Sequence, residues 1–131
     1  MSEPIAAMIA VLVILEVKHF IFDYVLQTAY QVSNKGKYGH RGGIIHSGLH
    51  VLGTSAAFLV VTPSLELGAS ILVGEFLLHY HVDWAKDHVV RWAGVNATDR
   101  RFWWAIGADQ LIHHLTYVAI ATILILSQAA I

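Results

Sequence analysis

Pairs of metal-binding residue types occur four positions apart in four apolar stretches of the chain. The pairs are His19 with Asp23, His46 with His50, His79 with Asp83, and Asp109 with His113. Residues four apart share one face of an α-helix, and an ionisable side chain inside a membrane helix is costly and marks a functional site by default. Four such faces turned toward one another would form a polar pocket in a helical bundle, where metal sites are commonly built. The sequence therefore predicts a metal centre made from these eight side chains.

The types of donor indicate which metal the centre would hold. Five imidazoles and three carboxylates can offer about four ligands to each of two ions, and mixed nitrogen and oxygen donors suit zinc, manganese, iron or cobalt. The chain has no cysteine, which excludes thiolate zinc sites, iron–sulfur clusters and disulfides. We therefore expect one or two divalent ions, with zinc as the first candidate, and a bound water activated as a nucleophile.

Further polar residues flank the pairs. Glu16, Glu75, Gln27 and Gln110 are placed to orient the imidazoles, and Glu75 could instead act as a general base. Lys35 and Lys86 would lie at the mouth of the pocket, where a phosphate-bearing substrate could be held. The candidate catalytic residues are thus Glu75 and Lys86, and the candidate substrate-binding residues are Gln27, Lys35, Arg41 and Gln110.

The composition is typical of a small membrane protein. The 131 residues are 56% hydrophobic and 13% charged, about half the charged fraction of roughly 25% found in soluble proteins. Four apolar runs come close to the length that a bilayer core requires, and Thr62-Pro63-Ser64 predicts a turn between the second and third. We therefore predict a single all-α domain over residues 1–131, an integral membrane four-helix bundle with spans at about 5–28, 44–61, 67–87 and 102–126.

The distribution of positive charge predicts the orientation in the membrane. Seven of the eight Lys and Arg residues lie in or beside two connections, namely Lys35, Lys37 and Arg41 in the first and Lys86, Arg91, Arg100 and Arg101 in the second. The positive-inside rule places both connections in the cytoplasm and both termini outside, in a bacterial inner membrane. The net charge of −1 excludes a basic surface for nucleic acid. The expected partner is the lipid bilayer, and a homo-oligomer is compatible with the sequence.

The pairs also repeat along the chain. His79 and Asp83 follow His19 and Asp23 by 60 positions, and the Asp109/His113 pair follows the His46/His50 pair by 63. This spacing predicts two helical hairpins in parallel repeat, related by a pseudo-twofold axis along the membrane normal. Lys18 lies deep in the first span, and we expect it to pair with Glu75 or another buried carboxylate. His81, His88 and His114 have no partner four residues away and are interpreted as helix–helix hydrogen-bond donors.

These residues resemble a known family. The segments that carry the resemblance are 19–28 (HFIFDYVLQT), Lys35, 46–50 (HSGLH), 79–86 (HYHVDWAK) and 109–113 (DQLIH). In this order they are similar to the bacterial and phage membrane family catalogued as domain of unknown function 3307. That resemblance implies the four-helix membrane fold and these polar positions, without an established activity. The stretch from His40-Arg41-Gly42 to His46-Ser47 also resembles an element of phage-type membrane-bound metal-dependent hydrolases, with one extra residue between its halves.

Three classes of function follow from the sequence. The first is an intramembrane hydrolase that acts on a lipid-linked ester or phosphoester at the cytoplasmic leaflet. The second is a metal-ion or proton carrier, which is disfavoured because residues 6–15, 52–61 and 118–126 contain no ionisable side chain. The third is a di-iron or haem membrane oxidoreductase, of which the haem form fits poorly with three carboxylates.

Overall fold

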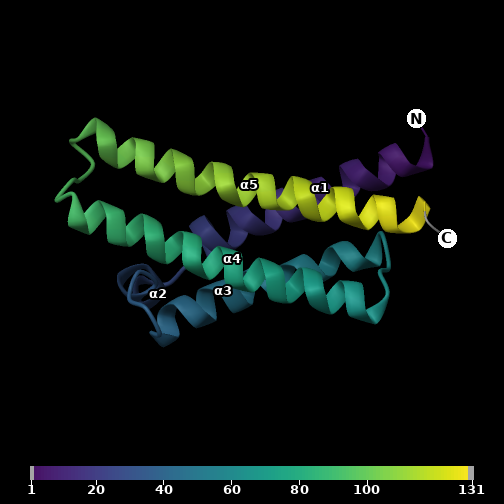
Figure 1. The fold of residues 1–131 in the computed structure, drawn as a ribbon, viewed down its shortest axis with the longest axis horizontal. Coiled ribbons are helices and arrows are strands. Elements are labelled where there is room, and N and C mark those ends of the chain that lie inside the picture. The colour runs from purple at the N-terminus through teal and green to yellow at the C-terminus, as the bar shows by residue number, and fades with distance from the viewer. Residues whose placement is uncertain (1, 130–131) are drawn as a thin grey trace.

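The computed structural model describes residues 2–129, which form helices joined by short connections (Figure 1). The prediction of an all-α protein is confirmed. The elements are α1 (Glu3–Phe20), a π-helix (Ile21–Val25), α2 (Ala29–Asn34), α3 (Arg41–Thr54), a 3-10 helix (Ser55–Leu59), α4 (Leu65–Trp92) and α5 (Arg100–Ala129).

Local sequence signals explain where several of these helices begin. The Thr28 side chain accepts a hydrogen bond from the Gln31 backbone N–H, and the Gln31 side chain reaches back to the Thr28 backbone. This capping box starts α2, which the sequence analysis did not anticipate. The Ser64 side chain caps α4 by a single hydrogen bond, which it accepts from the Leu67 backbone N–H. The predicted turn at residues 62–64 is therefore present.

The four long helices pack in a ring. α1 packs against α3 and α5, and α4 packs against the same two helices, so that α1 and α4 lie on one diagonal. This is the arrangement expected if the α1–α3 and α4–α5 hairpins are related by a pseudo-twofold axis. Figure 1 shows both termini and the turn at residues 62–64 at one end of the ring, and the connections from α2 to α3 and from α4 to α5 at the other.

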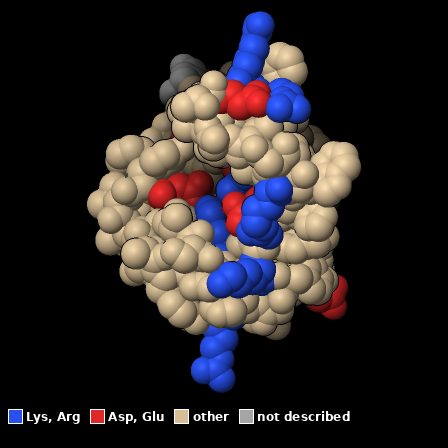
Figure 2. Space-filling view, turned by 90° about the vertical axis from the view of Figure 1, so that its left-hand side faces the viewer, with Lys and Arg blue, Asp and Glu red and all other residues tan. Residues whose placement is uncertain are grey.

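The two halves of the ring differ in what they bury. Toward the termini, the interior is an apolar cluster of Val11, Leu15, Ala57, Val61, Ile71, Tyr117, Ile120, Ala121 and Leu124. Toward the other end, the buried side chains are histidines, carboxylates and lysines. The outer surface of the ring is largely apolar, because large apolar side chains on every long helix are exposed. Figure 2 views the end of the ring that carries the two longer connections. Charged side chains gather there around a recess in which further charged atoms are visible.

Two helical segments are long and apolar enough to cross a membrane, residues Glu3–Val25 and Arg100–Gln128. Both coincide with predicted spans. The other two predicted spans correspond to α3, which has 14 residues before the 3-10 helix begins, and to α4, which carries Glu75, Asp83 and Lys86 along its length. The placement of these two in a membrane is a proposal that we take up below.

Candidate metal centre

The eight predicted donors meet inside the ring, near the end that carries the two longer connections. His19 lies on α1 and Asp23 on the π-helix that follows it, and α3, α4 and α5 each contribute one further pair. Seven of the eight residues are at most 5% exposed, and the Asp23 side chain is 8% exposed. His19 and His113 are 94 positions apart in the sequence, yet their side chains share one buried site.

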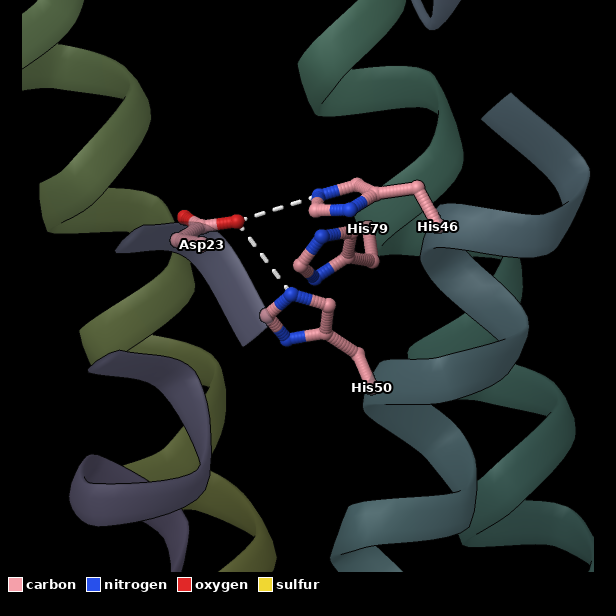
Figure 3. A group of neighbouring side chains, drawn as sticks. All are labelled: Asp23, His46, His50 and His79. Carbon is pink, nitrogen blue, oxygen red and sulfur yellow. Dashed lines mark hydrogen bonds and ion pairs between the residues drawn. The ribbon is translucent and has the colours of Figure 1, made fainter. Parts of the chain in front are cut away.

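The first group of potential ligands consists of Asp23, His46, His50 and His79 (Figure 3). One ligand atom of each lies within 4.8 Å of those of the other three. Asp23 Oδ1 is 3.0 Å from His46 Nε2 and 3.2 Å from His50 Nε2, while the His50 and His79 ring centres are 4.0 Å apart. Because zinc ligands lie about 2.0–2.2 Å from the ion, small adjustments would bring these four atoms around one metal.

The second group consists of His79, Asp83 and His113, whose ligand atoms also lie within 4.8 Å of one another. The His79 and His113 ring centres are 4.2 Å apart, and His79 Nε2 is 3.6 Å from Asp83 Oδ2. His79 belongs to both groups. A neutral imidazole has one nitrogen free for a metal, so His79 can serve one ion at a time. The geometry therefore fits one ion in either group, or two ions of which one takes His79.

Buried polar atoms in and beside these groups lack hydrogen-bond partners among the described residues. The unpaired atoms include His50 Nδ1, His79 Nε2, Asp109 Oδ1 and both ring nitrogens of His113. A buried polar atom without a partner costs roughly 1–3 kcal/mol. Several such atoms at one place are free to bind a further group, and imidazole nitrogens are suitable metal ligands.

His19 and Asp109 lie beside the two groups rather than within them. His19 Nε2 is 3.0 Å from Gln110 Oε1 and 3.2 Å from Asp23 Oδ2, and both oxygens accept. This places the ring proton on Nε2, so that Nδ1 accepts from the Tyr117 hydroxyl at 2.9 Å. With both nitrogens engaged, His19 orients the Asp23 carboxylate. Asp109 Oδ2 accepts from the Gln110 amide at 3.0 Å, which fixes that amide's orientation.

The π-helix determines where Asp23 lies. Its hydrogen bonds connect residues five apart, as in the bond of 2.8 Å from the Leu26 backbone N–H to the Ile21 carbonyl. π-helical turns are rare and frequently occur at functional sites. The corresponding segment of α4, around Asp83, is a regular α-helix. The two carboxylates are therefore presented differently, and this local difference breaks the pseudo-twofold relation predicted from the spacing.

A buried ion pair lies between the eight donors and the apolar cluster. Lys18 Nζ is 2.5 Å from Glu75 Oε1 and also donates to the His50 backbone carbonyl at 3.2 Å. It lies 4.4 Å from the centre of the Tyr117 ring. The prediction that Lys18 pairs with Glu75 is confirmed. The described polar contact of Glu75 is this ion pair with Lys18, which is a structural role. No described contact supports the predicted role of Glu75 as a base or as a partner of an imidazole.

The predicted mouth of the pocket corresponds to a real recess of about 240 Å³. Four residues predicted to bind substrate or act in catalysis line it, namely Gln27, Lys35, Lys86 and Gln110. Asp23 and Asp109 form part of its wall, so the recess reaches the donors. Lys35 donates to Asp83 Oδ1 at 3.2 Å, and Gln27 lies 3.2 Å from His46 Nδ1. The predicted role of Gln27 and Gln110 as partners of the imidazoles thus agrees with their contacts.

Other predicted residues lie elsewhere. Arg41 is exposed at the start of α3 and does not line the recess. Glu16 is 2.7 Å from His114 on the outer surface, so the prediction that it orients a cluster imidazole is wrong. The His40 side chain caps α3 by accepting from the Gly42 backbone N–H at 3.1 Å, which gives this part of the hydrolase-like element a structural role.

The remaining histidines of α4 have contacts outside the centre. His81 Nδ1 donates to the Leu77 carbonyl of its own helix at 2.6 Å, whereas the prediction was a hydrogen bond between two helices. The His88 ring stacks on Trp84. Sequence reasoning missed Tyr117, whose hydroxyl contacts His19. Its position two turns beyond Asp109 on α5 was the available signal.

Comparison with known proteins gives a family but no activity. A family described as a protein of unknown function (DUF3307) matches residues 11–131. No curated protein and no solved structure matches the chain. The match spans nearly the whole sequence and includes all eight donors, which confirms the resemblance to this family. No comparison supports the resemblance of residues 40–47 to phage-type hydrolases. The chain belongs to the DUF3307 family.

Proposed function

We propose that the chain is a multi-pass protein of the bacterial inner membrane and that its buried histidines and aspartates bind one or two divalent metal ions, zinc foremost. With metal bound at this centre, the protein would hydrolyse a lipid-linked ester or phosphoester at the cytoplasmic leaflet. The observation that carries the proposal is the pair of donor groups that share His79, with several ring nitrogens and carboxylate oxygens unpaired.

The distribution of polar and apolar residues supports the membrane placement. Large side chains such as Val13, Leu52, Leu77 and Leu111 are more than half exposed along the middle of the long helices. Extended apolar surfaces of this kind are rare on soluble monomers and fit contact with lipid. The basic residues lie at the end of the ring formed by the two longer connections. The positive-inside rule then favours that end for the cytoplasm.

The position of the donors favours a hydrolase over a carrier. A carrier needs polar groups along its whole path, but the half of the ring nearer the termini is filled by the apolar cluster around Leu15, Ile71 and Leu124. The recess beside Lys35 and Lys86 instead opens at the other end. A bound metal would polarise an ester or phosphoryl oxygen and activate a water, while the two lysines would hold a negatively charged group.

Spacing among the rings disfavours haem. The centres of neighbouring imidazoles are 4.0–5.4 Å apart, from the His50/His79 pair to the His19/His113 pair. A porphyrin between two histidine ligands would separate their rings much further. A di-iron centre uses similar donors, and a coloured purified protein with two irons would favour that chemistry over hydrolysis.

The proposal is tested by a hydrolysis assay on the full chain. Detergent-purified protein loaded with zinc is incubated with a bacterial membrane lipid extract, and released products are followed by mass spectrometry. We expect products from the wild type and from the control variant His88→Ala, whose ring is exposed and stacks on Trp84, and none from His79→Ala or from chelator-treated protein. Equal product formation by His79→Ala and wild type would refute the assignment of the centre.

A further inference from the structure

A second cavity adjoins the recess. It has a volume of about 380 Å³ and lies between α4 and α5. Its walls are apolar, with Val82 and Ala85 on α4 and Ala105 and Ala108 on α5. Cavities of about 300–1,000 Å³ are typical of ligand sites. The small side chains of the alanines keep the two helices from filling this space with their own atoms.

The apolar cavity and the polar recess share two residues, Lys86 and Asp109. A molecule that lay across both would have a hydrocarbon part between α4 and α5 and a polar part beside Lys35, Lys86 and the donors. Among residues 2–129, the one hydrogen-bond or ion-pair contact of the Lys86 ammonium group is that of 3.5 Å to Asp87, so the group is weakly held and available.

The charges at the junction favour an anion. Two divalent ions would carry four positive charges against three negative charges from Asp23, Asp83 and Asp109. Lys35 and Lys86 would add two positive charges, and Asp87 one negative charge. The site loaded with metal would therefore carry net positive charge near the Lys86 ammonium, and phosphate is the common anionic group of membrane lipids.

We infer that the α4–α5 cavity is the seat of one hydrocarbon chain of an anionic membrane lipid, whose phosphate group lies in the recess at Lys86. This inference rests on the proposed function and assigns its substrate class and its route of entry. The lipid enters sideways from the bilayer, between the two helices, and its head group reaches the donors without leaving the membrane interface. A soluble phosphate compound has no hydrocarbon chain that could fill the apolar cavity.

The inference is tested by photo-crosslinking in lipid nanodiscs. The probes are phosphatidic acid and phosphatidylcholine, each with a diazirine in the middle of one chain, and adducts are mapped by mass spectrometry. We expect phosphatidic acid adducts to concentrate on the α4–α5 cavity at a level about fivefold above positions of equal depth on α1 and α3, a preference of about 1 kcal/mol. Phosphatidylcholine adducts should spread evenly over the lipid-facing helices.

Variants on α5 provide a matched comparison. Ala108→Trp would fill the cavity, whereas Gly107→Trp adds the same side chain one position away, where a Cβ atom meets nothing within 4 Å. We expect the first variant, and Ala85→Trp from the opposite wall, to abolish the preferential labelling and the second to leave it unchanged. Lys86→Gln should remove the preference for phosphatidic acid.

Several results would overturn the inference. These are even labelling by phosphatidic acid, equal labelling of the cavity by both probes, equal effects of Ala108→Trp and Gly107→Trp, or complete competition by inorganic phosphate. Metal content is measured in the same samples. A protein that holds metal but labels evenly would refute the lipid site alone, and one that lacks metal but labels the cavity would refute the metal centre alone.

Discussion

The buried pair of Lys18 and Glu75 gives a prediction whose size can be worked out from the structure. At 2.5 Å the two charges attract by about 7 kcal/mol at an effective dielectric constant of about 20, and the cost of removing both from water offsets most of this gain. Removal of one partner leaves the other charge buried alone. We therefore expect Lys18→Met or Glu75→Leu to lower the free energy of unfolding by about 3–5 kcal/mol.

The double variant Lys18→Met/Glu75→Leu should recover most of that loss, because it leaves no unpaired charge and replaces the pair with apolar side chains. The assay is equilibrium unfolding in mixed micelles, followed by circular dichroism and extrapolated linearly to zero denaturant. Arg101→Gln is the control. Its exposed pair with Asp99 lies at the connection between α4 and α5, outside the membrane, and its loss should leave the free energy of unfolding almost unchanged. If the two single losses simply add in the double variant, the pair is uncoupled and the reasoning is refuted.

Three further predictions concern the centre and its packing. His19→Phe removes the N–H that orients the Asp23 carboxylate and should weaken zinc binding about 10–100-fold in a chelator competition, as loss of a ligand's orienting partner usually does; unchanged affinity would contradict the role given to His19. Gly53→Ala places a Cβ atom 2.6 Å from the Phe22 ring and should destabilise the fold by about 1–3 kcal/mol. Gly48→Ala, with open space around it, should stabilise it by up to about 1 kcal/mol in the same unfolding assay. Protons compete with metal for imidazole nitrogens, so zinc should be released below about pH 6 in a titration that follows bound metal.

The sequence predicted the helical class, the turn at residues 62–64 and the meeting of the paired donors, because each depends on patterns repeated over many residues. Apolar length fixes the long helices, and the spacing of four places each pair on one face. The partner of Lys18 was also predictable, since a buried charge at that depth needs an opposite charge, and Glu75 lies one turn before His79.

Other features depend on local geometry that a regular helical pattern does not contain. The π-helix at residues 21–25 adds one residue to a turn and thereby sets the direction of Asp23. The division of the donors into two groups around His79, with His19 engaged by Tyr117 and Gln110, follows from that shift. Glu16 was assigned to the interior by its spacing from His19, but it lies on the outer face of α1, where His114 reaches it.

The most direct test of the account is the metal content of the purified full-length chain, measured by elemental analysis beside the double variant Asp23→Ala/His79→Ala and the control His81→Ala. We predict one or two divalent ions per chain in the wild type and in the control, and a loss of nearly all metal in the double variant. Equal metal content in the wild type and the double variant would contradict the metal centre.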